Sequence, residues 1–408
     1  MMINVEEIRK DFPMLKKTMH GHPLVYLDNG ATTLKPQCVI DSVVEYLTSY
    51  SGNAHRGDYD LSHEVDEQFE LSREKIASFI NAKKNEVVFT SGSTDSLNMI
   101  AYGFGGVVLN EGDEILLSVA EHASNTLPWF SIADEKKAIV NYIDLDESGK
   151  ITIDNVKKAM NEHTKIISLA HVTNVLGYEV PIKEICELAH AKGAYVIVDG
   201  AQSVPHMRVD VKDLDLDFLA FSGHKMCGPT GIGVLYGKYD LLVKMKPLRL
   251  GGGSNTRYNS CGVVTLKNPP YKFEAGTPHI EGVVGLGSAV DYLLNIGIDE
   301  IREYEKYLRD YCISKMKELD NIEIYNSDSC GAIAFNIKNV FSQDGASLFN
   351  TYGIAVRAGQ HCAKILDNYL DVTNTLRVSF YFYNTIEEID KFIEVCKKGD
   401  EFLDAFFG

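Results

Sequence analysis

One lysine, Lys225, carries the clearest sign of chemistry in this sequence. It lies in the string SGHK, directly after Phe218–Ser222 (FLAFS), a run that is typical of an internal β-strand. Taking an amine out of water disfavours its charged form and lowers its pKa, so such a lysine can form a Schiff base with an aldehyde. A solvated loop lysine is the alternative, and the neighbouring Gly223 and His224 argue against it.

A carboxylate, Asp199, ends a second apolar run, Ala194–Asp199 (AYVIVD). A carboxylate at that depth needs a partner. The protonated nitrogen of a pyridine ring is such a partner, and the pairing keeps the ring an electron sink. A structural salt bridge or a helix cap is the alternative for Asp199 taken alone.

The segment Thr90–Thr94 (TSGST) joins a predicted strand to a predicted helix. Free backbone N–H groups and hydroxyls at the start of a helix form an anion site that suits a phosphate. Ser93 and Thr94 are therefore candidate phosphate ligands. A well-capped helix without a ligand explains the same residues, because serine and threonine are the usual caps.

Cys362 lies in the string RAGQHCA, between Arg357 and Ala363. A neighbouring arginine and histidine favour the thiolate, which is the useful nucleophile for sulfur transfer. The alternative is a structural cysteine packed in the core. That alternative is the better interpretation of the other seven cysteines, which are Cys38, Cys186, Cys227, Cys261, Cys312, Cys330 and Cys396.

Short apolar runs alternate with helical patterns through the middle of the chain. The predicted strands are Glu86–Thr90, Glu114–Ser118, Ile166–Ala170, Ala194–Asp199, Phe218–Ser222 and Gly233–Tyr236. Helices such as Asp95–Gly103 and Ile182–Lys192 separate them, which predicts a mostly parallel sheet covered on both faces. Because ligands collect at the carboxyl ends of such strands, we expect one site there. His122, Asn174 and Gln202, which also follow these strands, belong to it.

The pattern changes near residue 285. Val283–Leu319 is a long helical stretch with a break near Gly297. The predicted elements beyond it are strands at Ile322–Tyr325, Gly331–Ile337 and Thr375–Phe380 and helices near Asp344–Tyr352 and Ile386–Phe402. This is typical of a smaller α+β domain. We therefore predict a large domain over 21–285 and a small domain over 286–408, with residues 1–20 packed on the small domain.

Composition narrows the class of protein. The chain has 408 residues and a net charge of -17, which argues against nucleic acid as a main partner because phosphate contacts need clustered lysine and arginine. No segment has the pattern of an export signal, and no apolar run approaches the ~18 residues that span a membrane. The scattered cysteines contain no CxxC pair, which predicts reduced thiols in a cytoplasmic protein and no metal site.

Two further patterns imitate binding motifs. Asp144–Gly149 resembles the start of a calcium loop, but Asn155 stands where the loop needs a glutamate, so we expect a turn. The glycines of Gly228–Gly233 and Gly251–Gly253 are not in the strand–glycine–helix order of a dinucleotide site.

The motifs together resemble the class V aminotransferase group of fold-type I pyridoxal-phosphate (PLP) enzymes, and more narrowly the SufS-type (group II) cysteine desulfurases. The similarity covers nearly the whole chain. The strings that carry it are IRKDFPMLKKTMHGHPLVYLDNGATTLKP, NAHRGDYDLS, AEHASNTLPW, VDGAQSVPH, SGHKMCGPTGIGVLYG, FEAGTPH and RAGQHCA. Each is moderately specific, and all of them in this order are highly specific.

The resemblance implies a cofactor site for PLP. Lys225 would bind the cofactor covalently and then transfer protons, His122 would stack on the pyridine ring, Asp199 would pair with its nitrogen, and Gln202 would bond its hydroxyl. The residues that would hold the phosphate are Ser93, Thr94, Ser222, His224 and, from the partner subunit of a homodimer, Thr277.

The resemblance also implies a reaction. Asn174 and Arg377, with Arg357 nearby, would bind the carboxylate of L-cysteine. Cys362 would take the sulfur as a persulfide and leave alanine. The compact cysteine loop is similar to the group II pattern, in which a SufE- or SufU-like protein accepts the sulfur for uses such as iron–sulfur cluster assembly.

The chain departs from the family pattern at three places. Ser91 stands where arginine is common, Asn29-Gly30-Ala31 where two alanines are usual, and Gln360 where histidine is frequent. None of these removes a residue with an implied catalytic role. Two alternatives stay open: a selenocysteine lyase or other class V PLP lyase, and a regulator that keeps the fold without the activity.

Overall fold

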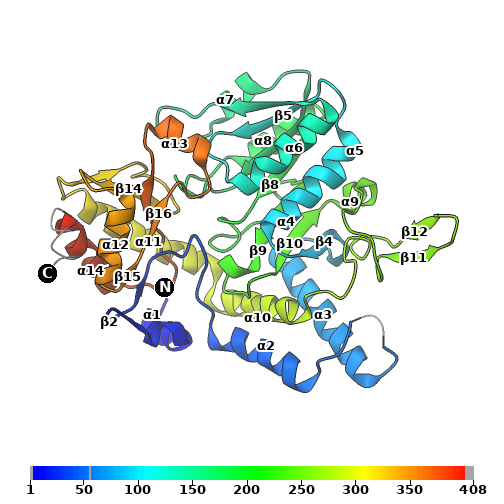
Figure 1. Cartoon of the computed structure of the whole chain (residues 1–408), viewed down its shortest axis with the longest axis horizontal. Coiled ribbons are helices and arrows are strands. Elements are labelled where there is room, and N and C mark those ends of the chain that lie inside the picture. The colour runs from blue at the N-terminus through cyan, green and yellow to red at the C-terminus, as the bar shows by residue number, and fades with distance from the viewer. Residues whose placement is uncertain (1–2, 55–56, 400–408) are drawn as a thin grey trace.

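The main sheet of this computed structural model, which describes residues 3–54 and 57–399, has seven strands in the order β4-β10-β9-β8-β7-β5-β6 (Figure 1). Their bounds are β4 (Val87–Thr90), β5 (Glu114–Ser118), β6 (Ile139–Ile143), β7 (Thr164–Ala170), β8 (Tyr195–Asp199), β9 (Phe218–Ser222) and β10 (Gly233–Gly237). Strand β10 pairs antiparallel with both β4 and β9, and the pairings from β9 to β6 are parallel. The predicted mostly parallel sheet is confirmed.

Both faces of this sheet are buried. Ile197 packs in one hydrophobic cluster, whereas Val196 and Val198, which point the other way along the strand, pack in a second cluster. The helical elements that contribute to the first cluster are α4 (Ser93–Asn98), the π-helical η3 (Met99–Gly105), α5 (Gly106–Val108), α6 (Leu127–Lys136) and α9 (Tyr239–Lys244). Those that contribute to the second include α2 (Gln37–Ser49), α3 (Asp60–Phe79), α7 (Ile153–Ala159), α8 (Ile182–Ala191) and α10 (Ile280–Ile296). This double cover explains why the strands have apolar residues on both faces.

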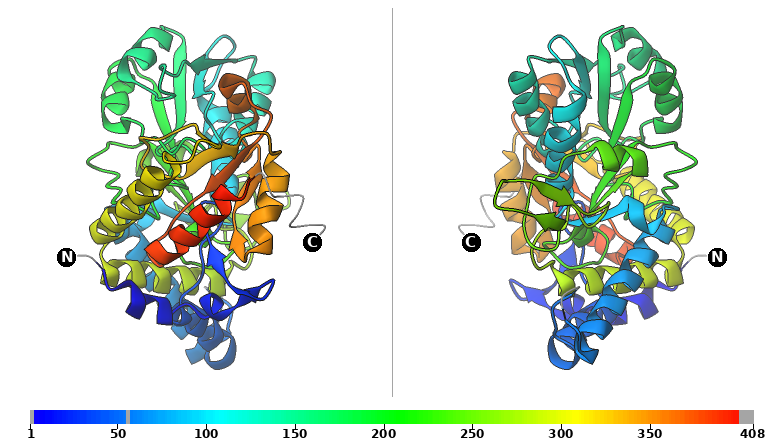
Figure 2. Two further views of the ribbon diagram at one scale, coloured as in Figure 1. Left: turned by 90° about the vertical axis from the view of Figure 1, so that its left-hand side faces the viewer. Right: turned by 90° about the vertical axis from the view of Figure 1, so that its right-hand side faces the viewer.

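A second, antiparallel sheet lies beside the first and has the order β13-β14-β17-β16. Its strands are β13 (Ile322–Ile324), β14 (Ile333–Ile337), β16 (Arg357–Gly359) and β17 (Thr375–Val378). The helices of this part are α11 (Ile298–Met316), α12 (Ser342–Thr351), α13 (Lys364–Leu370) and α14 (Ile386–Lys397). Figure 2 shows α14, in red, lying across this sheet. Gly297, with φ 101°, separates α10 from α11, which confirms the predicted break.

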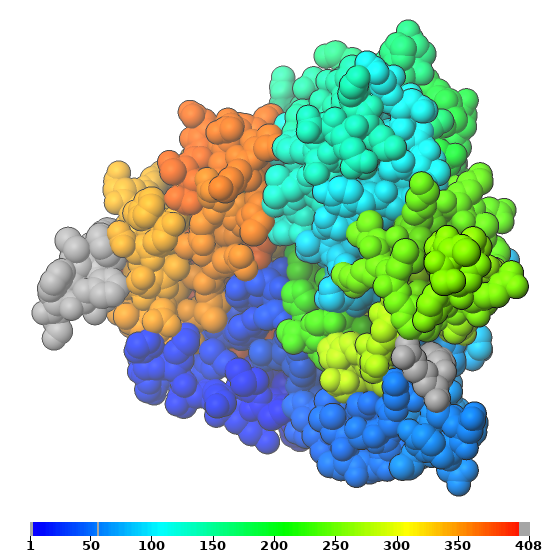
Figure 3. Space-filling view, turned by 45° about the vertical axis from the view of Figure 1, so that its right-hand side comes forward, coloured from blue at the N-terminus to red at the C-terminus, as the bar shows by residue number. Residues whose placement is uncertain are grey.

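The first residues of the chain pack against the C-terminal part. Arg9, in α1 (Val5–Lys10), forms a 2.9 Å ion pair with Glu388 of α14. Further along, β3 (Val25–Tyr26) pairs in parallel with β15 (Ile354–Ala355). The space-filling view shows the blue N-terminal residues against the orange C-terminal ones (Figure 3). The remaining elements of this segment are η1 (Pro13–Lys16), β1 (Thr18–Met19) and β2 (His22–Pro23).

The division into two domains stays a prediction. Residue 285 lies inside α10, so the chain passes it without a break. The ends of the predicted division, residues 1–2 and 400–408, lie outside the described residues, as do His55 and Arg56 of the NAHRGDYDLS string and the last residues of the predicted helix Ile386–Phe402.

Strand β6 and the hairpin of β11 (Asn255–Tyr258) and β12 (Val264–Leu266) are among the elements that were not predicted, because none of these strands is a continuous apolar run. Strand β6 lies at the sheet edge and alternates exposed with partly buried residues. The hairpin is mostly exposed and projects from the body (Figure 1). The predicted turn at Asp144–Gly149 is confirmed, with Asp146 Oδ1 accepting the Ser148 N–H at 2.9 Å. In the described part of the chain, no helix combines the length and apolarity that crossing a bilayer requires.

Candidate functional site

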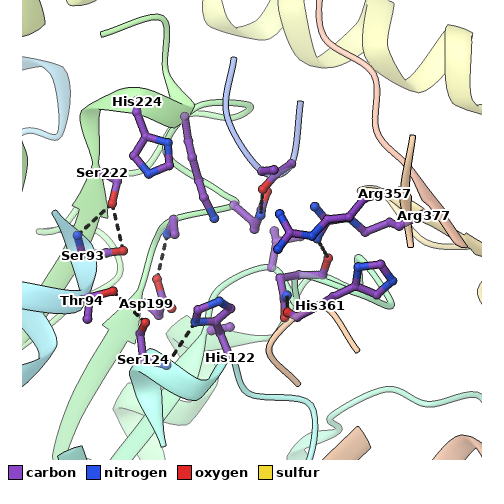
Figure 4. Close-up of a pocket in the computed structure, with 18 residues that line it drawn as sticks. Ser93, Thr94, His122, Ser124, Asp199, Ser222, His224, Arg357, His361 and Arg377 are labelled. Atoms are coloured by element: carbon purple, nitrogen blue, oxygen red, sulfur yellow. Dashed lines mark hydrogen bonds between the residues drawn. The ribbon is translucent and has the colours of Figure 1, made fainter. Parts of the chain in front are cut away.

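A cavity of about 220 Å³ lies at the carboxyl ends of the parallel strands, where the second sheet approaches them. Most of the predicted site residues line it, as Figure 4 shows. These residues are Ser93, Thr94, His122, Asn174, Asp199, Gln202, Ser222, His224, Lys225, Arg357 and Arg377. Residues from seven strands or strand ends therefore meet although up to 284 positions separate them in the chain.

Lys225 ends η5 (Gly223–Lys225), the single turn that follows β9. Burial lowers the pKa of its amine to about 8, while the nearby Asp199 carboxylate opposes that change. Within the described residues the amine has no hydrogen-bond or ion-pair partner. The lowered pKa raises the fraction of neutral amine, which is the form that attacks an aldehyde, above that of an ordinary lysine near pH 7.

Asp199 ends β8 beside this lysine. Its side chain is 5% exposed, and one carboxylate oxygen accepts the Ala201 N–H at 3.0 Å. Burial raises the pKa of Asp199 above its ordinary value. One hydrogen bond does not offset the cost of burying a charged carboxylate. A cation that enters the cavity would stabilise it, and a protonated pyridine nitrogen is such a cation.

His122 borders the cavity from the turn after β5. Burial, followed by the charges of Lys225, Arg377 and Arg357, lowers the pKa of its ring to about 4, so the ring is neutral at pH 7. Its Nδ1 accepts the backbone N–H of Ser124 at 3.1 Å, which leaves the proton on Nε2. A neutral ring of defined tautomer suits stacking on a cofactor.

Ser124 is a site residue that the sequence analysis missed. It lines the cavity, and its hydroxyl lies 2.7 Å from that of Thr94. It therefore connects the His122 turn to the predicted phosphate corner. Its place in the string AEHASN, two residues after His122, could have indicated that its hydroxyl lies at the same site.

Hydroxyl groups surround the predicted phosphate corner. Ser222 Oγ accepts the Ser93 N–H at 2.8 Å and lies 3.0 Å from Ser93 Oγ (Figure 4). Gly92, with φ 148°, makes the sharp turn that places Ser93 there, and side chains rarely adopt this backbone conformation. Burial lowers the pKa of His224 to about 4. Hydroxyl and N–H donors of the described residues line this corner of the cavity without a carboxylate among them, which suits the binding of an anion such as phosphate.

Thr277 lies on the surface, apart from the residues that line this cavity. Its predicted role was in the site of a partner subunit, so a single chain leaves it untested.

Two arginines face each other across the second sheet. Arg357 of β16 and Arg377 of β17 are directly opposed, and both line the cavity (Figure 4). Like charges in this position repel. Among the described residues, the one carboxylate within ion-pair distance of Arg377 is that of Asp28, at 3.4 Å. The pair is therefore suited to bind a carboxylate from outside the chain.

Asn174 connects these arginines with the cysteine loop. Its carbonyl oxygen accepts a hydrogen bond from Arg377 Nη1 at 2.9 Å, and its side-chain amide donates to the carbonyl of His361 at 2.8 Å. Its buried Oδ1 has no partner among the described residues. The predicted carboxylate ligand thus also holds the residue before Cys362.

Cys362 lies exposed at the rim and is not itself a lining residue. His361 and Cys362 both have left-handed backbone conformations, with φ 49° and 59°, and the Cys362 carbonyl accepts the Ala123 N–H at 2.7 Å. A thiolate charge here raises the pKa of Lys225, so the two groups act on each other through the cavity. His361 was expected only as a charged neighbour of the thiol, but burial lowers its pKa to about 3, so it carries no charge near pH 7. It lines the cavity instead, and its Nε2 contacts the Thr375 carbonyl at 3.1 Å.

The fold and this set of residues define a PLP-dependent enzyme of fold type I. The site provides a desolvated amine, a buried carboxylate, a neutral imidazole and a corner of hydroxyl groups, which are the groups that an aldehyde, a pyridine ring and a phosphate require.

Comparison with known proteins gives the family. The aminotransferase class-V model matches residues 25–392, and the chain belongs to that family. It is 46% identical to a probable cysteine desulfurase of Halalkalibacterium halodurans, over 99% of this chain and 100% of the relative. It is 42% identical to a cysteine desulfurase of Haloferax volcanii, over 98% of this chain and 97% of the relative.

Solved structures of proteins named cysteine desulfurase have the same fold as this chain. The crystal structure of a cysteine desulfurase from Escherichia coli has a TM-score of 0.91 and 36% identity, covering 98% of both chains. The apo structure of a cysteine desulfurase from Thermococcus onnurineus has a TM-score of 0.92 and 35% identity, also covering 98% of both chains.

Proposed function

We propose that this protein is a cysteine desulfurase that converts L-cysteine to L-alanine and holds the released sulfur as a persulfide on Cys362. The observation that carries the proposal is the two-sided cavity. Lys225, Asp199 and His122 border one side, and the arginine pair borders the other, next to the cysteine loop. Relatives and structural neighbours that bear the name cysteine desulfurase support it.

Each residue on the Lys225 side of the cavity has a role that follows from its chemistry. Lys225, the pKa of which burial lowers to about 8, would hold the cofactor covalently and, once released, would exchange protons near neutral pH. When bound, PLP withdraws electrons from the α- and β-carbons of the substrate. Asp199 would keep the ring nitrogen protonated, Gln202 would bond the ring hydroxyl, and Ser93, Thr94, Ser222 and His224 would hold the phosphate.

The arginine pair orients the substrate. Arg377 and Arg357 bind its carboxylate, with Asn174 beside them, and this places the sulfur toward the Cys362 loop.

Sulfur transfer balances without an outside oxidant. The Cys362 thiolate attacks the substrate sulfur, so an S–S bond forms while the C–S bond breaks. The β-carbon keeps the electron pair of the broken bond and takes a proton, which gives alanine. The atoms of cysteine and one protein thiol equal those of alanine and one persulfide.

Several finer assignments belong to this proposal. We assign the chain to the SufS-type group, as a homodimer in which Thr277 reaches the phosphate of the partner's site. We expect a SufE- or SufU-like acceptor and a cytoplasmic location. The free state of all eight cysteines supports that location. We also keep the two-domain division near residue 285.

An assay of alanine release tests the proposed function. The protein, a thiol reductant and L-cysteine should yield alanine and sulfide in equal amounts, and candidate acceptor proteins should raise the rate. L-selenocysteine in parallel tests the selenocysteine lyase alternative. Alanine from selenocysteine alone would favour that alternative, and no alanine from either substrate, with or without acceptors, would favour a regulator.

A further inference from the structure

A second lysine, Lys35, lies mostly buried and has no place in the chemistry above. Burial lowers the pKa of its amine to about 8, so it is still largely protonated at pH 7. No carboxylate among the described residues lies within ion-pair distance of it. An ammonium taken from water without a counter-charge is costly, so the fold must compensate it with hydrogen bonds.

Those hydrogen bonds converge on the turn that carries Lys225. The Lys35 ammonium donates to the carbonyl of His224 at 3.0 Å, to Thr32 Oγ1 at 3.3 Å and to the carbonyl of Thr33. The carbonyl of His224 belongs to the peptide group that links His224 to Lys225. Lys35 therefore acts on the main chain immediately before the cofactor lysine.

The same carbonyl receives further donors from the Lys35 segment. The backbone N–H of Thr33 and the hydroxyl of Thr32 each lie 3.0 Å from the His224 oxygen. The Thr33 hydroxyl in turn accepts the Cys227 N–H at 2.8 Å. With the Thr33 hydroxyl at 3.2 Å, four donors surround this oxygen, which has two lone pairs, so the acceptor is fully used and the turn is held from this side.

The opposite side of the turn is held by the main sheet. Gly223 donates its N–H to the Ile232 carbonyl at 2.9 Å, and its own carbonyl accepts the N–H of Met226 and of Gly228. A Cβ on Gly223 would lie 2.8 Å from the Ile232 side chain, so the turn packs tightly against the sheet on this side. On the side that contacts Lys35, the Thr33 N–H is joined by side-chain donors, and these are the contacts that a substitution can remove.

We propose that Lys35 is a positioning residue that fixes the Lys225 turn, and with it the place of the Lys225 amine, from outside the cavity. The inference rests on the proposed role of Lys225 as the cofactor lysine. A lysine side chain has several rotatable bonds, so its amine reaches one point reliably only if its backbone is fixed. Lys35 provides that constraint by a charged donor, which is stronger than a neutral one.

The experiment measures how fast Lys225 captures the cofactor. The holoenzyme is stripped with hydroxylamine and then given excess PLP. The visible absorption of the lysine Schiff base is followed in time, and borohydride reduction with peptide mass spectrometry locates the bond. For Lys35→Met, which keeps the apolar stem, we expect capture roughly tenfold slower, because small misplacement of a reacting group costs that much or more. Lys35→Arg, which keeps a charged donor, should restore most of the rate.

Lys272 offers a matched control. It is also buried and also donates to two main-chain carbonyls, of Val243 at 2.9 Å and of Met245 at 2.8 Å, but it lies away from the Lys225 turn. Lys272→Met should lower thermal stability as Lys35→Met does and leave capture within about twofold of the original rate. Equal slowing in both variants would mean that Lys35 is merely structural and would overturn the inference.

A milder variant keeps the test decisive if Lys35→Met does not fold. Thr32→Val removes one donor to the His224 carbonyl with little change in shape, and we expect capture roughly threefold slower. Unchanged capture in Thr32→Val and in whichever Lys35 variants fold would overturn the inference. Capture by Lys225→Ala at another lysine would instead refute the cofactor assignment, so the two failures are distinguishable.

Discussion

The turn of Lys225 and the loop of Cys362 lie at the same cavity but are built in opposite ways. The lysine turn is enclosed, and its His224 carbonyl is bonded from the Lys35 segment. The cysteine loop is at the rim, where Cys362 is exposed with a left-handed backbone. A group that keeps a cofactor must be desolvated and fixed. A thiol that collects sulfur and then gives it away must also be reachable from solvent.

Replacement of the enclosed group has the largest expected effect. Lys225→Ala should lose the borohydride-reducible bond to PLP and reduce alanine formation by roughly 10⁴-fold, because both the covalent anchor and the proton carrier are removed. Mass spectrometry of the reduced protein checks the anchor. A PLP adduct on another lysine with normal turnover would contradict the assignment.

Replacement of the exposed group should separate sulfur transfer from cofactor binding. Cys362→Ser should reduce persulfide and alanine formation from cysteine by roughly a thousandfold. The visible absorption of bound PLP should stay unchanged, because Cys362 lies outside the lining of the cofactor pocket. The matched control is Cys330→Ser, which should keep full turnover. Cys330 was expected in the core, but it is exposed, as Cys38 and Cys261 are, so that expectation was wrong for these three cysteines. Full cysteine turnover in Cys362→Ser would refute its role.

The enclosure of Lys225 should also appear as a pH dependence of stability. In the cofactor-free chain the pKa of this amine is lowered from 10.5 to about 8, so between these values the unfolded state binds more protons. Stability should therefore rise with pH across this window, by up to roughly 3 kcal/mol, and the penalty should be complete below pH 8.

Urea unfolding of the cofactor-free protein at several pH values measures this effect. Lys225→Met removes the titrating amine, so the difference between the two proteins isolates it from other groups, including Lys35. Parallel pH profiles in both proteins would show that Lys225 is not desolvated.

The smallest effect is expected for Gln360, the residue in the cysteine loop where related sequences often have histidine. Burial raises the pKa of Asp367, and a hydrogen bond from Gln360 opposes that change, so Gln360 acts on the loop and not on the cavity. Gln360→His should change turnover by about twofold or less, as surface substitutions usually do. Measurement of kcat and KM for cysteine checks this, and a tenfold change would give Gln360 a catalytic role.

The strand-end residues could be predicted because local pattern and fold rules suffice for them. An apolar run followed by Asp199 or by Gly223-His224-Lys225 already places those side chains at the carboxyl edge of a parallel sheet. Ser124 and His361 could not be found in this way. Each is a polar residue in an ordinary loop, and its access to the cavity depends on contacts such as His361 with Thr375.

By itself, the sequence determined the class of fold, which chemistry-bearing residues follow each strand and the candidacy of Lys225 and Asp199, since these follow from periodicity and from which residues end each strand. Only the tertiary structure decided that Arg357 stands opposite Arg377 and that Lys35 supports the peptide group before Lys225. The physical reason is that register and long-range hydrogen bonds join residues far apart in the chain, 189 positions in the case of Lys35 and His224. Such contacts exist only after the chain has packed.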